Sequence, residues 1–412
     1  MTKLSTISLY TGAGGLDYGF EAAGFRTRVA VEMDAVCVET LRRNRRWPVI
    51  CDDINRATTR RLLNKAELRR QEADVLIGGP PCQPFSKSGY WATGSTKRLF
   101  DPRASTLENF LRVLEEARPR SFLMENVEGL GFRGKDEGLQ YIKARLDEIN
   151  ASQGTTYKPF TAVLNAAHFG VPQFRRRMFI VGARDGSLFE FPKPTHASAN
   201  EINLDGRRRY ATPWDALRGV RVSKSDGDLR LRGKWADLLP TIPEGQNYLW
   251  HTERGGGEPL FGWRRRYWSF LLKLSKDAPS WTIQAQPGPA TGPFHWMNRR
   301  LSIREMGRLQ TFPRDVEIVG SYADAQRQLG NAVPSLLAEV LAREIASQLL
   351  GCPAKGAIKL AIRPSPTPPP PPERTIPVPR QYLSLRGSHE AHPGTGKGYR
   401  ASERDLSFDI GA

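Results

Sequence analysis

The sequence predicts an α/β protein in which a parallel sheet is covered by helices on both faces, together with a smaller, loop-rich domain. From residue 6 to residue 183, short apolar runs rich in β-branched residues alternate with longer amphipathic segments, which is the pattern of consecutive βαβ units. From residue 184 to residue 296 this alternation gives way to Gly, Pro, Arg and Trp. With 412 residues, of which 39% are hydrophobic, the chain is long enough for two globular units.

The expected strands and helices alternate along the first part of the chain. Short apolar runs predict strands at 6–10, 27–31, 75–78, 121–125, 162–164 and 178–181. Amphipathic segments between them predict helices at 16–23, 35–44, 106–117 and 140–150. A strand-like piece at 280–284 lies in the loop-rich part, and helical patterns return at 302–309 and 335–349. We therefore expect the chain to re-enter the first domain after an excursion.

These patterns divide the chain into four parts. Residues 1–183 are expected to form the first domain, 184–297 the loop-rich domain, and 298–351 the return to the first domain. Residues 352–412 are rich in proline, notably from Pro364 to Pro372, and show no periodic apolar face. We expect this tail to be disordered and dispensable for the activity of the protein.

The charge and the cysteines limit the class of protein. A formal net charge of +18 predicts a surface that attracts a polyanion, with nucleic acid the first candidate and an acidic membrane the second. No N-terminal run resembles a signal peptide, and no stretch approaches the ~20 apolar residues that a membrane span needs. Cys37, Cys51, Cys82 and Cys352 are too widely spaced for a zinc site or a small disulfide scaffold. We expect a soluble, cytoplasmic protein with free thiols and no metal.

A glycine-rich turn follows the first predicted strand. Residues 10–16 read Tyr-Thr-Gly-Ala-Gly-Gly-Leu, and such glycines let the backbone turn tightly and approach a ligand. Turns of this kind serve several nucleotide-like cofactors and also occur as plain tight turns. Glu32 ends the second strand, where a carboxylate can accept hydrogen bonds from both ribose hydroxyls. Asp53 offers a carboxylate for an adenine amino group and Ile54 an apolar wall for the ring. Together these residues predict an adenosine pocket, which suits a dinucleotide or S-adenosylmethionine equally well.

The most informative segment is 78–86, which reads Gly-Gly-Pro-Pro-Cys-Gln-Pro-Phe-Ser and directly follows the apolar strand 75–77. Its glycines and prolines fix a loop that holds the thiol of Cys82 at the carboxyl end of a strand. A cysteine that only fills a core would have an apolar setting rather than a rigid polar loop. The segment therefore indicates a nucleophilic thiol.

This loop resembles the catalytic loop of the DNA (cytosine-5) methyltransferases, which carries a Pro-Cys-Gln core. The resemblance covers residues 7–349 and is closest in kind to the bacterial modification methylases. It implies a Rossmann-like, S-adenosylmethionine-dependent methyltransferase domain, with residues 184–297 as a target-recognition domain. The other family motifs follow in the expected order, as Glu125-Asn126-Val127, Gln173-Phe174-Arg175-Arg176-Arg177, residues 300–313, and Gln328-Leu329-Gly330-Asn331-Ala332-Val333-Pro334.

The chemistry of the family explains these residue types. Carbon 5 of cytosine is a poor nucleophile, and a thiolate added at carbon 6 converts the ring to an enamine-like species that can attack an electrophilic methyl group. The resemblance assigns the thiolate to Cys82 and the carboxyl group that carries its proton to N3 to Glu125. Asn126 would hold the loop geometry. Arg175 and Arg177 are suited to bonding the carbonyl oxygen of the base or a nearby phosphate, and their charge would favour the thiolate.

The resemblance also implies the ligand contacts. Ser8 stands where many relatives carry Asp, Tyr10 where Phe is common, and Met33 where a bulky residue is frequent. The expected contacts to S-adenosylmethionine are Tyr10, Gly12, Ala13, Gly14, Gly15, Leu16, Glu32, Met33, Asp53, Ile54, Pro81, Asn331 and Ala332. A cytosine inside a duplex must be rotated into a pocket to react, and phosphate and base contacts are best made by polar and basic side chains beside aromatics. The expected DNA contacts are Gln83, Ser86, Arg264, Arg265 and Arg266.

We therefore predict a monomeric DNA (cytosine-5) methyltransferase that modifies a specific double-stranded sequence and accompanies a restriction endonuclease acting on the same site. Two alternatives stay open. A tRNA cytosine-5 methyltransferase would keep the catalytic motifs, but the recognition region is long and the Cys-Phe-Thr tripeptide of that branch is absent. A catalytically silent DNA-binding regulator would have no need of Cys82, Glu125 and the glycine turn together.

Overall fold

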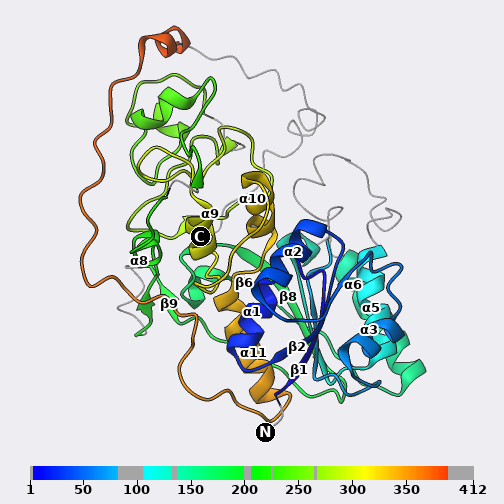
Figure 1. The fold of residues 1–412 in the computed structure, drawn as a ribbon. Helices are drawn as coiled ribbons and strands as arrows, with labels where there is room; N and C mark the ends of the chain where they lie inside the picture. The colour runs from blue at the N-terminus through cyan, green and yellow to red at the C-terminus, as the bar shows by residue number, and fades with distance from the viewer. Residues whose placement is uncertain are drawn as a thin grey trace.

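A seven-stranded sheet with helices on both faces forms the centre of the molecule (Figure 1). The strands lie in the order β3-β2-β1-β4-β5-β8-β6, and this arrangement confirms the predicted α/β fold class. The computed structural model describes residues 3–81, 105–131, 137–198, 206–223, 226–263 and 267–387.

Each predicted strand and helix of the first domain overlaps an observed one. The sequence did not predict β3 (Val49–Cys51), α3 (Thr59–Ala66) or, later in the chain, α10 (Tyr322–Asn331). The strands of the sheet are β1 (Ser5–Leu9), β2 (Arg26–Glu32), β3 (Val49–Cys51), β4 (Val75–Gly78), β5 (Ser121–Val127), β6 (Phe160–Asn165) and β8 (Arg176–Ala183). The helices before the recognition region are α1 (Gly15–Ala22), α2 (Ala35–Asn44), α3 (Thr59–Ala66), α5 (Ser105–Ala117) and α6 (Glu137–Gln153), with short 3-10 turns η3 (Glu128–Gly131) and η4 (Ala166–Phe169).

The sheet is not wholly parallel, which corrects the sequence-based prediction. Strand β8 runs antiparallel to both of its neighbours, β5 and β6. The connection from Asn165 to Arg176 holds only η4 and the short strand β7 (Gln173–Phe174). A parallel pair needs a longer crossover, usually through a helix, so this short connection returns the chain in the opposite direction.

Alternating side chains of the strands build a hydrophobic core on each face of the sheet. In β4, Leu76 packs with residues of α3, α5 and α6, whereas Val75 and Ile77 pack with residues of α1 and α11 (Ser335–Gln348). Helices α1 and α11 approach closely, because a Cβ added at Gly19 would lie 2.4 Å from the Cβ of Ala338. This burial on both faces is the main favourable term for the sheet.

Residues 184–297, which the resemblance predicts to be the target-recognition domain, are called the recognition region below. Their described part consists mainly of loops. Two further clusters of apolar side chains hold it, one shared with α9 and α10 and one around Tyr248, Leu271 and Phe294. Its short elements and the helices that follow are β9 (His196–Ala197), β10 (Arg208–Arg209), α8 (Pro213–Leu217), η6 (Ala236–Thr241), η7 (Tyr248–His251), β11 (Ser280–Trp281), α9 (Ile303–Leu309) and α10 (Tyr322–Asn331).

The C-terminal segment differs from the prediction that it is disordered throughout. Residues 352–387 run along the recognition region and end in η9 (Arg380–Leu385), where Tyr382 is buried (Figure 1). An extended segment needs no periodic apolar face, since its backbone groups and a few single side chains supply the contacts. Residues 388–412 lie outside the described ranges.

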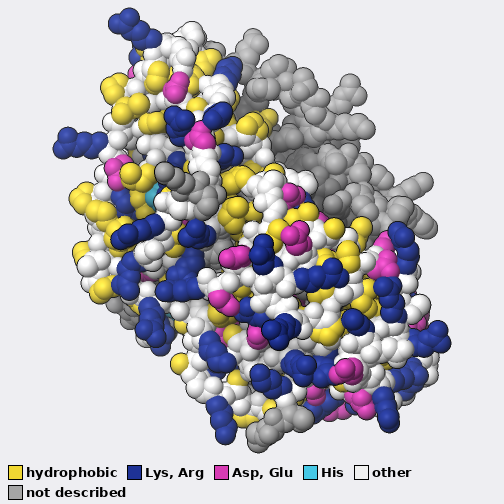
Figure 2. All heavy atoms as spheres, viewed as in Figure 1, with side chains coloured by type: hydrophobic (Ala, Val, Ile, Leu, Met, Phe, Trp, Pro, Cys, Tyr) yellow, Lys and Arg dark blue, Asp and Glu magenta, His cyan; other side chains and the backbone are white. Residues whose placement is uncertain are grey.

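The surface carries the positive charge that the composition predicts. On the face shown in Figure 2, Lys and Arg side chains are spread over the sheet domain and the recognition region and outnumber the acidic ones. Among the residues that the structure describes, no helix is long and apolar enough to cross a membrane.

Candidate active site

A tight glycine turn connects β1 to α1. Gly12 and Gly14 have left-handed φ angles of 55° and 87°, which residues with side chains rarely adopt. A Cβ on Gly15 would lie 2.3 Å from the carbonyl oxygen of Val333, so glycine is required where the turn meets the chain after α10. A Cβ on Gly12 would meet no atom within 4 Å. The turn is therefore open at Gly12 and closed at Gly15.

Glu32 lies at the end of β2 and bonds to this turn. Its Oε2 accepts a hydrogen bond from the amide of Gly12 at 2.7 Å, and its Oε1 accepts one from the amide of Asp34 at 2.8 Å. Burial raises the pKa of Glu32, and these backbone hydrogen bonds oppose that rise. Because each carboxylate oxygen has two lone pairs, Glu32 retains the capacity to accept hydrogen bonds from ligand hydroxyls.

The neighbouring residues of the predicted cofactor set differ in exposure. Met33, next to Glu32, is 70% exposed. Asp53 accepts hydrogen bonds at its Oδ1 from the backbone and side-chain amides of Asn55, at 2.9 and 2.8 Å. Ile54 is only 5% exposed and belongs to the core of the sheet. Its burial leaves little side-chain surface for the adenine wall that the sequence predicts.

The chain after α10 lies against the glycine turn. Asn331 ends α10 and is exposed, and Ala332 follows it. A Cβ on Gly15 would lie 3.1 Å from that of Ala332. Ala13 and Leu16 are buried, so a ligand at the turn would meet their backbone rather than their side chains. The structure thus brings the two distant parts of the predicted cofactor set together.

A buried acidic residue that sequence analysis missed supports the turn. Asp17 accepts hydrogen bonds from the hydroxyls of Ser8 at 2.9 Å and Thr27 at 3.0 Å. Burial raises its pKa to about 7, and the two hydroxyl donors oppose the rise. Ser8 also hydrogen bonds with the hydroxyl of Thr11 at 3.0 Å. Ser8 therefore lies beside a carboxylate that α1 supplies.

Glu125 on β5 forms the centre of the predicted catalytic set. It is 9% exposed, and its Oε1 lies 3.1 Å from Nε of Arg177 on β8. Burial raises the pKa of Glu125, while the charges of Arg177 and Arg175 oppose the rise. Arg175 is 1% exposed and donates to the carbonyl oxygen of Gly330 at 2.8 Å. Burial and the nearby Arg177 charge hold the pKa of Arg175 well below its ordinary value.

The backbone after β4 passes next to this carboxylate. A Cβ on Gly79 would lie 3.0 Å from Oε2 of Glu125. The buried Asn126 donates from Nδ2 to the carbonyl oxygen of Pro80 at 3.1 Å, and its Oδ1 accepts from the amide of Val127 at 2.8 Å. Asn126 therefore holds the backbone that leads directly into the predicted nucleophile loop.

Helix α5 connects the two predicted parts of the site. The carbonyl oxygen of Thr106 accepts a hydrogen bond from the hydroxyl of Tyr10 at 2.7 Å, and its own hydroxyl donates to the carbonyl oxygen of Pro81 at 2.8 Å. Arg112, further along α5, donates to the carbonyl oxygen of Ile54 at 2.9 Å. Thr106 and Arg112 were not predicted from the sequence, since each acts through segments far from it in the chain.

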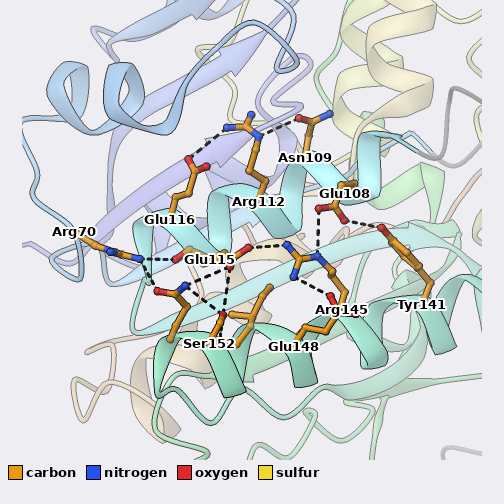
Figure 3. Close-up of polar contacts among 12 residues, drawn as sticks. Arg70, Glu108, Asn109, Arg112, Glu115, Glu116, Tyr141, Arg145, Glu148 and Ser152 are labelled. Carbon is orange, nitrogen blue, oxygen red and sulfur yellow. Dashed lines mark hydrogen bonds and ion pairs between the residues drawn. The ribbon is translucent and has the colours of Figure 1, made fainter.

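A polar network holds α5 against α6. Arg145 on α6 pairs with Glu115 at 2.7 Å and with Glu108 at 3.3 Å, both on α5, and Glu108 also accepts from the hydroxyl of Tyr141 at 2.6 Å (Figure 3). The same view shows Arg112 turned to the other side of α5. Because several charges share these contacts, the network holds its side chains in place more firmly than an isolated surface ion pair does. The network therefore stabilises the helix that carries Thr106.

The Gln-x-Arg-x-Arg element is tied to the helix after the recognition region. Gln173 is fully buried and donates to Oε1 of Gln310 at 3.1 Å, while its own Oε1 accepts from the amide of Ile283 at 3.1 Å. Arg327 on α10 pairs with Asp34 after β2. Like the hydrogen bonds of Thr106, these contacts join segments that are far apart in the sequence, so no local sequence pattern predicts them.

Several predicted site residues lie outside the described ranges. Trp263 and Tyr267, which border the predicted basic cluster, are 44% and 41% exposed. The residues that fall outside are Cys82, Gln83, Ser86, Arg264, Arg265 and Arg266.

A cavity of about 510 Å³ is lined by residues such as Gly288, Arg300 and Arg327 and does not include the glycine turn. In the part of the chain described, no cluster of three or more His, Cys, Asp or Glu residues could hold a metal ion.

Known proteins resemble this chain over most of its length. The family model of the C-5 cytosine-specific DNA methylases matches residues 4–347. The type II methyltransferase M.SacI of Streptomyces achromogenes is 39% identical over 375 residues, which cover 84% of this chain and 94% of that protein. The type II methyltransferase M.NgoFVII of Neisseria gonorrhoeae is 33% identical over 347 residues, covering 83% and 86%.

Solved structures show the same fold at low sequence identity. The Entamoeba histolytica methyltransferase EhMeth superposes with a TM-score of 0.58 at 14% identity, over 85% of this chain and 99% of that one. The Dnmt2 methyltransferase of S. pombe gives a TM-score of 0.54 at 17% identity, over 84% and 99%. At these identities the likeness concerns the fold alone.

Proposed function

Because this chain belongs to the C-5 cytosine-specific DNA methylase family, we propose that it transfers a methyl group from S-adenosylmethionine to carbon 5 of a cytosine within a specific double-stranded DNA sequence. The reaction proceeds through a covalent bond between Cys82 and carbon 6 of the base. The names of the two relatives described above support a further step, in which the protein is the modification enzyme of a type II restriction-modification system. It then acts as a cytoplasmic monomer whose partner endonuclease cuts the same sequence.

The observation that carries this proposal is the position of Glu125 beside the backbone that leads into Cys82. Gly79 approaches the Glu125 carboxyl group, and Asn126 bonds to Pro80, two residues before the cysteine. The nucleophile and the acid therefore come from the carboxyl ends of the adjacent parallel strands β4 and β5. Ligands of open α/β sheets bind outside the carboxyl ends of the strands.

The residues of the glycine turn fit S-adenosylmethionine. The turn is open at Gly12, and Glu32 can accept hydrogen bonds from ribose hydroxyls while it holds the turn. Met33 offers an exposed apolar surface for the adenine ring, and Asp53 a carboxylate for its amino group. When bound, S-adenosylmethionine supplies the electrophilic methyl group.

The protein's own groups then activate the base. The Cys82 thiolate forms a bond to carbon 6, and the Glu125 carboxyl group, hydrogen bonded at N3 through its proton, stabilises the charge that develops in the ring. Burial favours the neutral carboxyl form that this role requires. Arg177 lies beside Glu125 and is suited to bonding the carbonyl oxygen of the base.

Cysteine release completes the cycle. After carbon 5 has gained the methyl group, a base removes its proton, the sulfur–carbon bond breaks, and Cys82 leaves as a thiolate. Among the residues that the structure describes, none is assigned to this step, and a water molecule can take up the proton and pass it to solvent. The target cytosine has to leave the helix for these contacts, at a cost of a few kcal/mol for unstacking, which contacts from the recognition region would offset.

Bisulfite sequencing of the genome of cells that express the protein tests the proposal. The host should lack its own cytosine methylation, and nucleosides from its DNA and its tRNA should also be identified by mass spectrometry. We expect 5-methylcytosine in DNA at one short sequence, and none with the Cys82→Ser variant, because a hydroxyl is far harder to ionise than a thiol.

Three results would contradict the proposal. These are methylation confined to tRNA, methylation of DNA by the Cys82→Ser variant, or unmethylated DNA from cells that hold soluble wild-type protein able to bind S-adenosylmethionine. The last result would favour the silent DNA-binding regulator. Purified wild-type and variant proteins should be compared for cofactor binding, so that misfolding is distinguished from loss of chemistry.

A further inference from the structure

Residues 352–387, named here the C-terminal strap, lie beyond the part of the chain that the family model matches. In Figure 1 the strap is the orange-to-red trace that leaves α11 and follows the outer edge of the recognition region as far as η9. Prolines are frequent between Pro364 and Pro379. An extended, proline-rich chain is semi-rigid, so its two ends are held at a nearly fixed separation.

The first end of the strap is anchored to α11 of the sheet domain. Glu339 has no solvent exposure, and its two carboxylate oxygens accept hydrogen bonds from the amides of Lys359 and Leu360, each at 2.8 Å. Arg343 pairs with Glu339 at 3.0 Å and donates to the carbonyl oxygen of Ala357 at 2.7 Å. A buried carboxylate without such partners is costly, so Glu339 depends on the strap for two of its hydrogen bonds.

The strap then bonds to α8 of the recognition region. The amide of Ser365 donates to Oδ1 of Asp215 at 2.7 Å, and Nε1 of Trp214 donates to the carbonyl oxygen of Thr367 at 3.1 Å. Asp215 also forms the capping box of α8 with Thr212. The strap therefore bonds to the N-terminal cap of α8, a helix of the recognition region.

A buried ion pair is completed by the strap further along. Lys276 is almost fully buried and its Nζ lies 2.6 Å from Oε1 of Glu244, which is also buried. The same nitrogen donates to the carbonyl oxygen of Pro371 at 3.1 Å, and Glu373 lies 3.8 Å away. The amide of Glu373 donates to Glu244 at 3.0 Å. An ammonium group has three donors to satisfy, and the strap supplies the carbonyl oxygen of Pro371 as an acceptor in addition to Glu244.

The far end of the strap is anchored by an aromatic side chain. Tyr382 is 3% exposed and stacks on Trp235, with ring centroids 5.9 Å apart and an interplanar angle of 16°. Its hydroxyl donates to the carbonyl oxygen of Lys234 at 2.7 Å. It belongs to the apolar cluster that contains Tyr248 and Leu271. One core of the recognition region therefore includes a residue from the C-terminal strap.

We propose that the C-terminal strap is a positioning element for methyl transfer, which ties α11 to the far side of the recognition region and keeps that region in the orientation that receives DNA. This inference rests on the proposed function. Both ends are fixed by buried groups, Glu339 at one and Tyr382 at the other, and the chain between them is semi-rigid. Loss of the strap should therefore affect binding and discrimination of DNA rather than the chemistry on the base.

Truncated and point variants of the full chain test this inference. Truncation after Gly351 removes the strap, whereas truncation after Gly387 retains it and serves as the control. Tyr382→Ala removes the far anchor, and Tyr382→Phe keeps the ring but loses the hydrogen bond. Thr375→Ala changes an exposed side chain of the same segment. Each protein is assayed for the KM for DNA, the single-turnover rate at saturating DNA, and the Kd of S-adenosylmethionine.

A shift in orientation should raise the KM for DNA and lower the preference for the target over single-mismatch sites. Because contacts between a misplaced recognition region and DNA would be lost, we expect the KM for DNA to increase about tenfold or more after truncation at Gly351, and less for Tyr382→Ala. Tyr382→Phe should lie between Tyr382→Ala and the wild type. The single-turnover rate and cofactor Kd should stay within about twofold of wild type, as should all parameters of the two controls.

An unchanged KM and unchanged discrimination after truncation at Gly351 would overturn the inference. A purely structural role would instead reduce the fraction of active enzyme without moving the KM of the remainder, and this outcome would also overturn it. If the truncated protein does not fold, Tyr382→Ala and Tyr382→Phe decide by the same criteria.

A second measurement does not depend on catalysis. Hydrogen exchange of the amides of η6, next to Trp235, should be faster in Tyr382→Ala than in Thr375→Ala, and no difference would contradict the inference. If even the full chain methylates no DNA, the proposed function fails, and this exchange difference still shows whether the strap holds the recognition region.

Discussion

Replacing Glu32 with alanine should weaken the binding of S-adenosylmethionine by roughly 10- to 140-fold. The carboxylate accepts hydrogen bonds from Gly12 at 2.7 Å and Asp34 at 2.8 Å, and we propose that it also accepts the ribose hydroxyls. Hydrogen bonds to a charged group contribute about 1.5–3 kcal/mol, and about 1.4 kcal/mol corresponds to a tenfold change in Kd. Glu32→Gln should fall between the wild type and Glu32→Ala, because its amide keeps one acceptor oxygen but turns a donor toward one backbone amide.

Isothermal titration of the purified proteins with S-adenosylmethionine measures this effect. Glu39→Ala is the matched control, since Glu39 is an exposed glutamate on α2 close in sequence to Glu32, and its Kd should stay within about twofold of wild type. Thermal unfolding without ligand separates weaker binding from loss of the fold. Unchanged cofactor affinity in a folded Glu32→Ala protein would refute the reasoning, because it would mean that the ribose is bound elsewhere.

Three further predictions concern groups around this site. Burial raises the pKa of Asp17 to about 7, so the stability that its protonated form contributes is fully present below its ordinary pKa and is lost as pH rises through about 7. In urea unfolding, Asp17→Asn should show no such loss of stability with pH. An equal pH dependence of stability in both proteins would contradict this prediction. Burial raises the pKa of Glu125, so the single-turnover rate of methyl transfer should fall as pH rises through that pKa. Glu125→Gln should flatten this limb and slow the reaction by about 100- to 10,000-fold, whereas a wild-type rate independent of pH would exclude the acid role. Thr106→Val removes the hydrogen bond to Pro81 and should slow single turnover by about 2- to 13-fold, the equivalent of about 0.5–1.5 kcal/mol. Thr106→Ser should restore the rate, and a slow Thr106→Ser protein would show that the hydroxyl is not the relevant group.

Local patterns were sufficient for most of the sheet domain. Apolar runs located six of its strands, and the glycines of residues 12–15 and the acid Glu32 could be predicted because both lie directly at strand ends. The direction of β8 could not, since the alternation of apolar residues is the same in parallel and antiparallel strands. Its direction follows from the short connection after Asn165, whose effect depends on how the chain folds back.

Contacts between distant segments account for what the sequence did not reveal. Thr106 bonds to both Tyr10 and Pro81, and no periodicity or motif indicates that pairing. In the sequence, Asp17 is indistinguishable from an ordinary acidic residue in the first turn of a helix. Only the structure shows that Ser8 and Thr27 donate hydrogen bonds to it. The strap was predicted to be disordered because its composition is proline-rich. The contacts that hold the strap in place are one buried tyrosine and a series of backbone hydrogen bonds. Such contacts cannot be recognised from composition.

The most direct test of the proposed mechanism is covalent trapping of the enzyme on fluorinated DNA. Wild-type protein and Cys82→Ser are incubated with S-adenosylmethionine and a duplex in which 5-fluorocytosine replaces cytosine, and the products are denatured and examined by mass spectrometry. Fluorine at carbon 5 cannot leave as a proton does, so the final elimination is blocked. We predict a denaturation-resistant wild-type adduct that maps to the peptide containing Cys82 and is absent from Cys82→Ser. Absence of the adduct from a wild-type protein that methylates ordinary DNA, or an adduct at another residue, would contradict covalent catalysis by Cys82.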